Sequence, residues 1–146
     1  MPTTLETVGV LRPTNALPNG FAEAHGRLAS FSALQANWDG YGAGPIPPAI
    51  LSAVRAFLDR LAQMSSPPVP RDSTFPAVVP LSSGAVQLEW HVGERILELE
   101  FETAEVIHFL KWWPQKGVAV EGTYFANDLS RSVTLLDWVL CGHDSA

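Results

Sequence analysis

The sequence has little charge and almost no cysteine. Charged side chains make up 16% of its 146 residues, and Cys141 is the one cysteine, so no disulfide can form within the chain. A chain without disulfides suits a reducing compartment. No apolar run approaches the roughly 18 residues of a membrane span, and no signal-peptide pattern is evident at the start. We therefore expect a cytoplasmic protein that does not contact a membrane.

The chain is also poor in basic residues and in catalytic motifs. Nine Lys and Arg stand against fifteen Asp and Glu, which argues against direct nucleic-acid binding because phosphate contacts need clustered cations. Glycine-rich nucleotide loops, zinc-protease and calcium-loop motifs and the nucleophile elbow are all missing. Cys141 and His143 are close neighbours, whereas a catalytic pair is normally assembled from distant segments. The sequence predicts no catalytic residue, metal site or cofactor.

Hydrophobic residues, by contrast, are plentiful. They make up 47% of the chain, enough for the core of a single domain over 1–146. Segment 1–20 has loop composition and is expected to be flexible. Apolar residues at steps of three and four predict a helix at 21–36 and a second one at 47–64. A Pro-rich linker at 65–74 then joins the helical part to the rest.

Beyond this linker the apolar period changes from helical to alternating, which indicates strands. Alternating or proline-bounded segments predict strands at 75–80, 85–92, 95–102 and 105–113. A final helix is expected between Asp128 as N-cap and Gly142 as C-cap. Its apolar face would hold Leu129, Val133, Leu136 and Leu140. The predicted fold class is α+β, with two N-terminal helices, an antiparallel meander of three to four strands and a C-terminal helix.

The Gly93-Glu94 pair predicts a tight type II′ turn that fixes a strand register. The resulting pairs are Val92 with Arg95, Trp90 with Leu97, Leu88 with Leu99, and Val86 with Phe101. All large apolar side chains of both strands then share one face, and this agreement supports the register.

The opposite face of this hairpin is acidic. Glu89 is predicted opposite Glu98 and Gln87 opposite Glu100, with Glu102 continuing the row. Like charges opposite each other cost up to about 1 kcal/mol. Three interpretations stay open: a solvent face relieved by Lys111 of the next strand, a patch for a basic partner, or a carboxylate cluster for a metal or catalysis. The same pairing sets His108 opposite Leu99, which predicts a core histidine.

Aromatic residues and one loop complete the candidate binding residues. Trp112 and Trp113 are adjacent in a strand, so one ring can enter the core while the other anchors an interface; Trp113 is the candidate. Trp138 has the same two interpretations. The stretch "NWDGYGAGPIPP" at 37–48 is either a joint between helices or a binding loop, in which Asp39 and Tyr41 would act. As a joint, it would pack Trp38 and Tyr41 on the helices.

The ordered combination of "NWDGYGAGPI", "GAVQLEW" and "LELEF" over residues 28–102 resembles a group of small bacterial proteins. That group shares an N-W-D-G-Y-G-A start and a G-x-[IV]-x-L-E-W…L-E-[ILV]-E hairpin. It carries no established activity, so the resemblance implies a fold and supplies no catalytic residue. It also implies an accessory role in mobile-element, phage-defence, counter-defence or toxin–antitoxin settings.

The sequence thus favours a non-enzymatic protein-binding module of the bacterial cytosol. It would dock its acidic sheet face and exposed aromatics on a protein partner with a basic or mixed surface. One alternative is an acidic mimic of nucleic acid that inhibits a nuclease or defence complex. Another is a small enzyme that uses carboxylates, in a cleft joining Asp39 or Tyr41 to the glutamate row.

Overall fold

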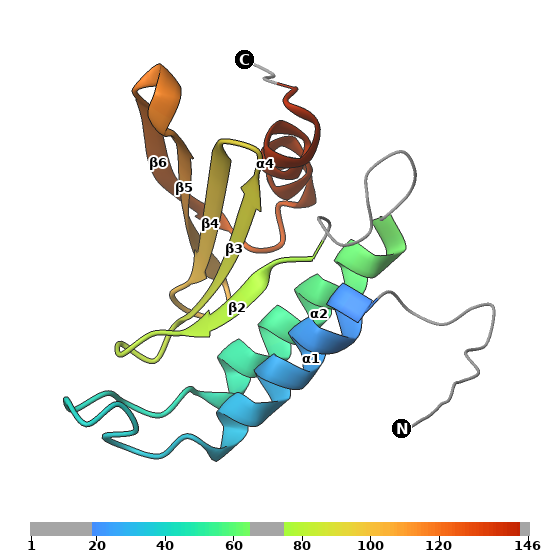
Figure 1. Ribbon diagram of the computed structural model, residues 1–146. Coiled ribbons are helices and arrows are strands. Elements are labelled where there is room, and N and C mark those ends of the chain that lie inside the picture. Colours follow the sequence, from blue (N-terminus) through green and yellow to red (C-terminus); the bar gives the residue numbers. More distant parts are fainter. Residues whose placement is uncertain (1–18, 65–74, 144–146) are drawn as a thin grey trace, which may run out of the picture.

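The computed structural model describes residues 19–64 and 75–143 (Figure 1). The linker predicted at 65–74 and nearly all of the loop predicted at 1–20 lie outside the described residues. The helices pack against one face of a single antiparallel sheet, so the α+β class is confirmed. The face that carries the helices is called the inner face below, and the opposite side of the sheet is called the outer face.

The N-terminal helices form an antiparallel pair. Helix α1 runs over Asn19–Ser30 and is followed by one 3-10 turn, η1 (Phe31–Ala33). The predicted helix at 21–36 was too long, because Leu34 already has an extended backbone with ψ of 125°. Helix α2 spans Pro48–Met64 and agrees with the prediction. Its whole predicted stripe is buried: Ile50, Leu51, Val54, Phe57, Leu58 and Leu61.

The sheet has five strands in sequential order, β2-β3-β4-β5-β6, rather than the predicted three to four. Their bounds are β2 Ala77–Pro80, β3 Val86–Val92, β4 Arg95–Phe101, β5 Val106–Trp113 and β6 Val118–Phe125. Strand β6 was not predicted because it is largely exposed and contains Gly122, a residue that is depleted in strands. The glycine has a tertiary reason: an added Cβ would lie 3.0 Å from Cε1 of Phe109.

The β3–β4 hairpin has the predicted register. All four predicted pairs are present, and Gly93 takes a φ of 60°, as the first central residue of a II′ turn requires. The inner-face side chains Leu88, Leu97 and Leu99 are fully buried and form the centre of the core.

The β4–β5 turn is one residue longer than predicted, and this shifts the next register. Thr103 Oγ1 accepts hydrogen bonds from the backbone N–H groups of Glu105 and Val106, at 3.1 and 3.0 Å. The extra turn residue pairs His108 with Glu100 instead of Leu99. The prediction of a core histidine was therefore wrong, since a one-residue slip moves every side chain of the strand to the other face.

Helix α4 (Leu129–Cys141) has both predicted caps. The Asp128 side chain accepts from the Arg131 N–H, and Gly142 is left-handed with φ of 79°. The predicted apolar face was right for Leu136, which is buried, and for Leu140, which packs partly buried against the core, but wrong for Leu129 and Val133, which are exposed. The buried side chains are Ser132, Leu135, Leu136, Trp138 and Val139. Ser132 belongs to this face because its hydroxyl lies 2.9 Å from the Tyr124 hydroxyl, which satisfies both polar groups inside the core.

The two faces of β4 give a direct test of this packing. Leu99→Ala should lower the free energy of unfolding by about 2–5 kcal/mol, because the fully buried side chain leaves a cavity. Ile96→Ala, on the outer face of the same strand, should cost about half as much because its side chain is only partly buried. Urea denaturation of both variants measures the difference. Equal losses would contradict the assignment of the two faces.

Candidate functional site

The outer face of the sheet carries the acidic row. Glu89 lies opposite Glu98, and Gln87 lies opposite Glu100, as predicted. Strand β6 adds Glu121, which pairs with Leu110 of β5, and the sequence offered no signal for this member because β6 was not expected. The outer face crosses all five strands. Strands β3 to β6 contribute these side chains to it: Gln87, Glu89, His91, Ile96, Glu98, Glu100, Val106, His108, Leu110, Trp112, Ala119, Glu121, Thr123 and Phe125.

The cations of the sheet and of α4 are gathered on the inner side. Arg95 donates from Nε and Nη2 to the Val139 carbonyl of α4, at 3.2 and 3.1 Å. Three further cations lie over inner-side aromatic rings, 4.9–5.2 Å from the centroids: Lys111 over Trp138, Lys116 over Trp113, and Arg131 over Phe109. The predicted relief of the acidic row by Lys111 was wrong, because the β4–β5 register turns that side chain inward.

Among the described residues, histidines are the only basic side chains on the outer face. His108 Nε2 lies 2.9 Å from Glu121 Oε1, which links β5 to β6 across the face. Gln87 Nε2 donates to Glu89 Oε2 at 2.6 Å and holds that carboxylate within its own strand. The carboxylates are therefore ordered by neutral or weakly basic partners, and the face remains negative at neutral pH.

This environment shifts the pKa of Glu98. Burial raises its pKa above 4.5, and the neighbouring charge of Glu89 adds to the rise. Glu100 acts in the same direction, whereas His91 and His108 lower the pKa. The net effect is upward, so the folded protein resists ionisation of Glu98.

Three side chains of this face could hold a divalent cation. One ligand atom each from Glu100, Glu102 and His108 lie within 4.8 Å of one another. Glu102 is exposed, and the Nε2 atom of His108 already contacts Glu121. A second such set, Asp137, Cys141 and His143, lies exposed at the end of α4.

Of the adjacent tryptophans, Trp112 rather than Trp113 belongs to the outer face. Trp112 is 43% exposed, and it pairs with Ile96 of β4. Trp113 packs partly buried against the core, with its ring centroid 6.4 Å from that of the buried Trp138. Trp113, the residue chosen from the sequence, therefore supports α4, and Trp112 offers the exposed aromatic surface.

The loop that contains Asp39 and Tyr41 docks on the turn between β2 and β3. Its Gly44 N–H donates to the Ser82 carbonyl at 3.1 Å. Inside the loop, Asp39 Oδ1 accepts from the backbone N–H groups of Tyr41 and Ala43, at 2.8 and 3.0 Å. Tyr41 is 92% exposed, so the expectation that it packs on the helices was wrong. Asp39 thus shapes the loop, and Tyr41 projects from it.

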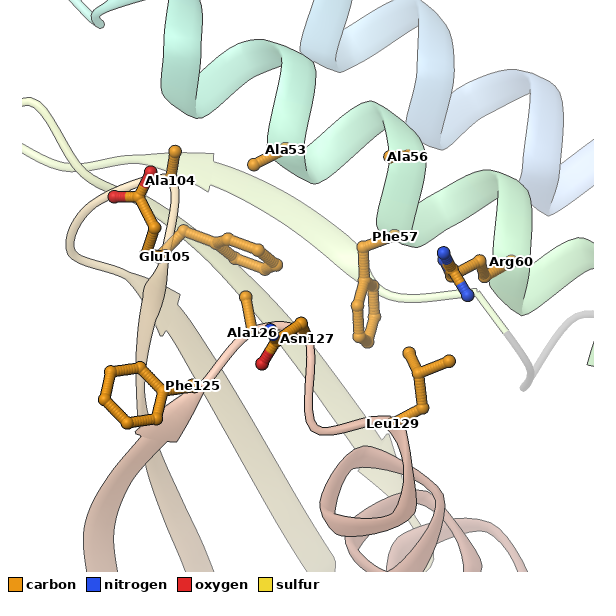
Figure 2. A pocket seen from close by; sticks show the side chains of 11 residues that line it. Ala53, Ala56, Phe57, Arg60, Ala104, Glu105, Phe125, Ala126, Asn127 and Leu129 are labelled. Carbon is orange, nitrogen blue, oxygen red and sulfur yellow. The ribbon is translucent and has the colours of Figure 1, made fainter.

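A groove of about 400 Å³ lies between α2 and the segments that follow β4 and β6 (Figure 2). The rings of Phe57 and Phe101 line the groove together, with their centroids 5.6 Å apart. Arg60 and Glu105 lie at opposite ends (Figure 2). Phe125, which is 68% exposed, lines the groove at the edge of the outer face. None of its lining residues is Asp39, Tyr41 or a member of the glutamate row, so this groove is not the cleft that the enzyme hypothesis requires.

Comparisons with protein-family models, with curated proteins and with solved structures found no match to this chain. Within residues 19–64 and 75–143, no helix is long and apolar enough to cross a membrane. The arguments about function below therefore come from the geometry and charge of the molecule itself.

Removal of the Glu98 charge should stabilise the protein. Because the folded state holds the Glu98 proton more tightly than the unfolded chain does, ionisation of Glu98 opposes folding at neutral pH. Glu98→Gln should raise the free energy of unfolding at pH 7 by on the order of 0.5 kcal/mol, the size of a cross-strand like-charge effect. This gain should shrink as the pH falls through the raised pKa and disappear below the ordinary value of 4.5. Urea titrations between pH 3 and 8 measure it, with Glu94→Gln in the exposed turn as the unaffected control.

Two substitutions in the loop that contains Asp39 and Tyr41 form a second matched pair of variants. Asp39→Ala should lower the free energy of unfolding by about 1–2 kcal/mol, because it removes the acceptor of two backbone N–H groups. Tyr41→Ala should leave stability unchanged, since the ring is almost fully exposed. Thermal unfolding by circular dichroism compares the two variants. A larger loss for Tyr41→Ala would show that the ring has a structural contact.

Proposed function

We propose that this protein is a non-enzymatic binding module that docks a basic segment of a protein partner on the outer face. The single observation that supports this most strongly is the separation of charge across the sheet. Arg95, Lys111, Lys116 and Arg131 all engage inner-side groups, whereas among the described residues only histidines lie as basic side chains beside the glutamates of the outer face. A partner with Lys or Arg side chains would supply the missing counter-charges.

The apolar part of the outer face fits the same role. Ile96, Leu110 and Trp112 lie among the carboxylates, and Trp112 is 43% exposed. Protein interfaces typically combine an aromatic and apolar centre with a polar surround. The face therefore offers hydrophobic contact area in addition to charge. Such a combination favours a folded or amphipathic partner over a simple polycation.

A mimic of nucleic acid is the alternative that uses the same carboxylates. It would need acidic groups spread along an extended surface in place of phosphates. On the outer face, Glu89 and Glu98 instead sit directly opposite each other on adjacent strands, about 4.8 Å apart by strand spacing, beside apolar side chains. This local and mixed arrangement favours a protein partner. The phage-defence and toxin–antitoxin settings implied by the resemblance would supply basic enzymes as candidate partners.

Neutralising the row tests the proposal. The triple variant Glu89→Gln, Glu98→Gln and Glu100→Gln should recover about tenfold less of its specific partner from an extract of the source cells, because counter-charges are lost. Quantitative mass spectrometry of tagged protein measures the recovery. Raised salt should weaken wild-type binding in the same way.

A matched control variant removes the same number of charges as the triple variant of the outer face. Glu23→Gln, Glu94→Gln and Asp137→Asn together remove three charges from exposed positions away from the outer face, and they should leave recovery unchanged. If both triple variants lose the partner equally, net charge rather than the outer face controls binding. If neither variant loses it, the proposed docking surface is wrong.

A further inference from the structure

The two edges of the sheet differ in how they are protected. At one edge, β2 has only four residues, Pro76 precedes it and Pro80 ends it. Helix α1 packs beside this strand, and Arg27 Nε donates to the Val78 carbonyl at 3.0 Å. Short length, prolines and covered backbone groups are the usual ways to prevent strand addition. The β2 edge is therefore closed.

The opposite edge has none of these protections. Strand β6 has eight residues and contains no proline, lysine or arginine. Its large apolar side chains are exposed, with Val118 at 42%, Val120 at 47% and Phe125 at 68%. Figure 1 shows β6 at the free side of the sheet, away from the helices. A long, apolar edge that none of the described segments covers is an expected site of strand pairing.

The register shows which backbone groups point outward from β6. The Ala126 N–H donates to the Glu105 carbonyl, and this contact belongs to the same register as the β5–β6 pairs. Hydrogen-bonded and non-bonded pairs alternate in an antiparallel ladder. Tyr124, Gly122 and Val120 are therefore bonded to β5. The intervening residues of β6, Ala119, Glu121 and Thr123, direct their N–H and C=O groups to the free edge.

We propose that β6 pairs in antiparallel fashion with β6 of a second copy of this chain, so that one sheet continues across a two-fold axis. Glu121 and Gly122 lie at the middle of β6, so an axis at either residue overlaps most of the two strands, and the charge of Glu121 decides between them. An axis at Gly122 sets Glu121 opposite Thr123 of the second copy, Val120 opposite Tyr124, and Ala119 opposite Phe125. An axis at Glu121 would instead place two like charges opposite each other, which is unfavourable.

A second copy fits this edge better than a basic peptide does. Glu121 is the single charge of β6, so the strand offers little electrostatic recognition to a foreign cation. In the register centred on Gly122, by contrast, the exposed Val120 would face Tyr124 of the second copy and the exposed Phe125 would face its Ala119, so these apolar side chains meet apolar or aromatic partners. A two-fold axis perpendicular to the sheet also keeps both outer faces on the same side. The dimer would place the two acidic outer faces next to each other. Formation of the dimer does not depend on whether these faces bind a basic partner.

Two edge variants test the dimer. Val120→Lys places a charge on the edge strand, and Thr123→Pro removes an outward N–H while leaving the ladder to β5 intact. Each should raise the dimer dissociation constant about tenfold or more in sedimentation-velocity experiments. Val133→Lys is the matched control, since this exposed valine lies on α4, and it should leave the constant unchanged. Far-ultraviolet circular dichroism checks that each variant is folded.

Two measurements on the unmodified chain keep the test independent of variant folding. Hydrogen exchange followed by NMR should show protected amides at Ala119, Glu121 and Thr123, because these groups would be bonded to the second copy. Raised salt should strengthen the dimer, since each copy carries a net charge of −6, whereas it should weaken docking of a basic partner. A wild-type protein that sediments as a monomer at high micromolar concentration, or fast exchange at these three amides, would overturn the proposal.

Discussion

Strict alternation along the β3–β4 hairpin is the constraint on which the other features depend. Successive side chains of a strand point to opposite faces, so the register that buries Leu88, Leu97 and Leu99 also forces Glu89 and Glu98 together on the other face. The apolar contribution of the buried set, at about 1.5–3 kcal/mol for each large side chain, exceeds the repulsion between opposed carboxylates, which is at most about 1 kcal/mol. The register that forms the core therefore also produces the acidic outer face.

The cations follow a different physical rule. Long Lys and Arg side chains can lay their apolar stems on a core while the charged end reaches aromatic rings or carbonyl groups at its rim. Arg95 reaches the Val139 carbonyl of α4, and Lys111 lies over the Trp138 ring. These contacts fasten α4 to the sheet. They also hold these positive charges away from the outer face, so that within the described part of the chain only histidines lie near the glutamate row as basic groups.

The success and failure of sequence reasoning have specific causes. The Gly93-Glu94 turn has a strong local signal, and its register was confirmed pair by pair. The next turn was misjudged because the Thr103 hydroxyl holds an extra residue in it, and this one-residue shift moved His108 to the outer face. Strand β6 was missed because its pairing energy comes from β5, and its glycine is explained only by the ring of Phe109.

Local sequence patterns were enough to predict helix α2, the caps of α4, the β3–β4 register and the opposition of Glu89 to Glu98, because each of these features depends on neighbours along the chain. The side of the sheet on which each cation lies, the choice of the exposed tryptophan and the difference between the two sheet edges became known only from the three-dimensional packing. These properties depend on contacts between segments distant in sequence, such as Arg27 with Val78 at the closed edge. No local pattern encodes such contacts, and they determine how the acidic face and the β6 edge are presented to partners.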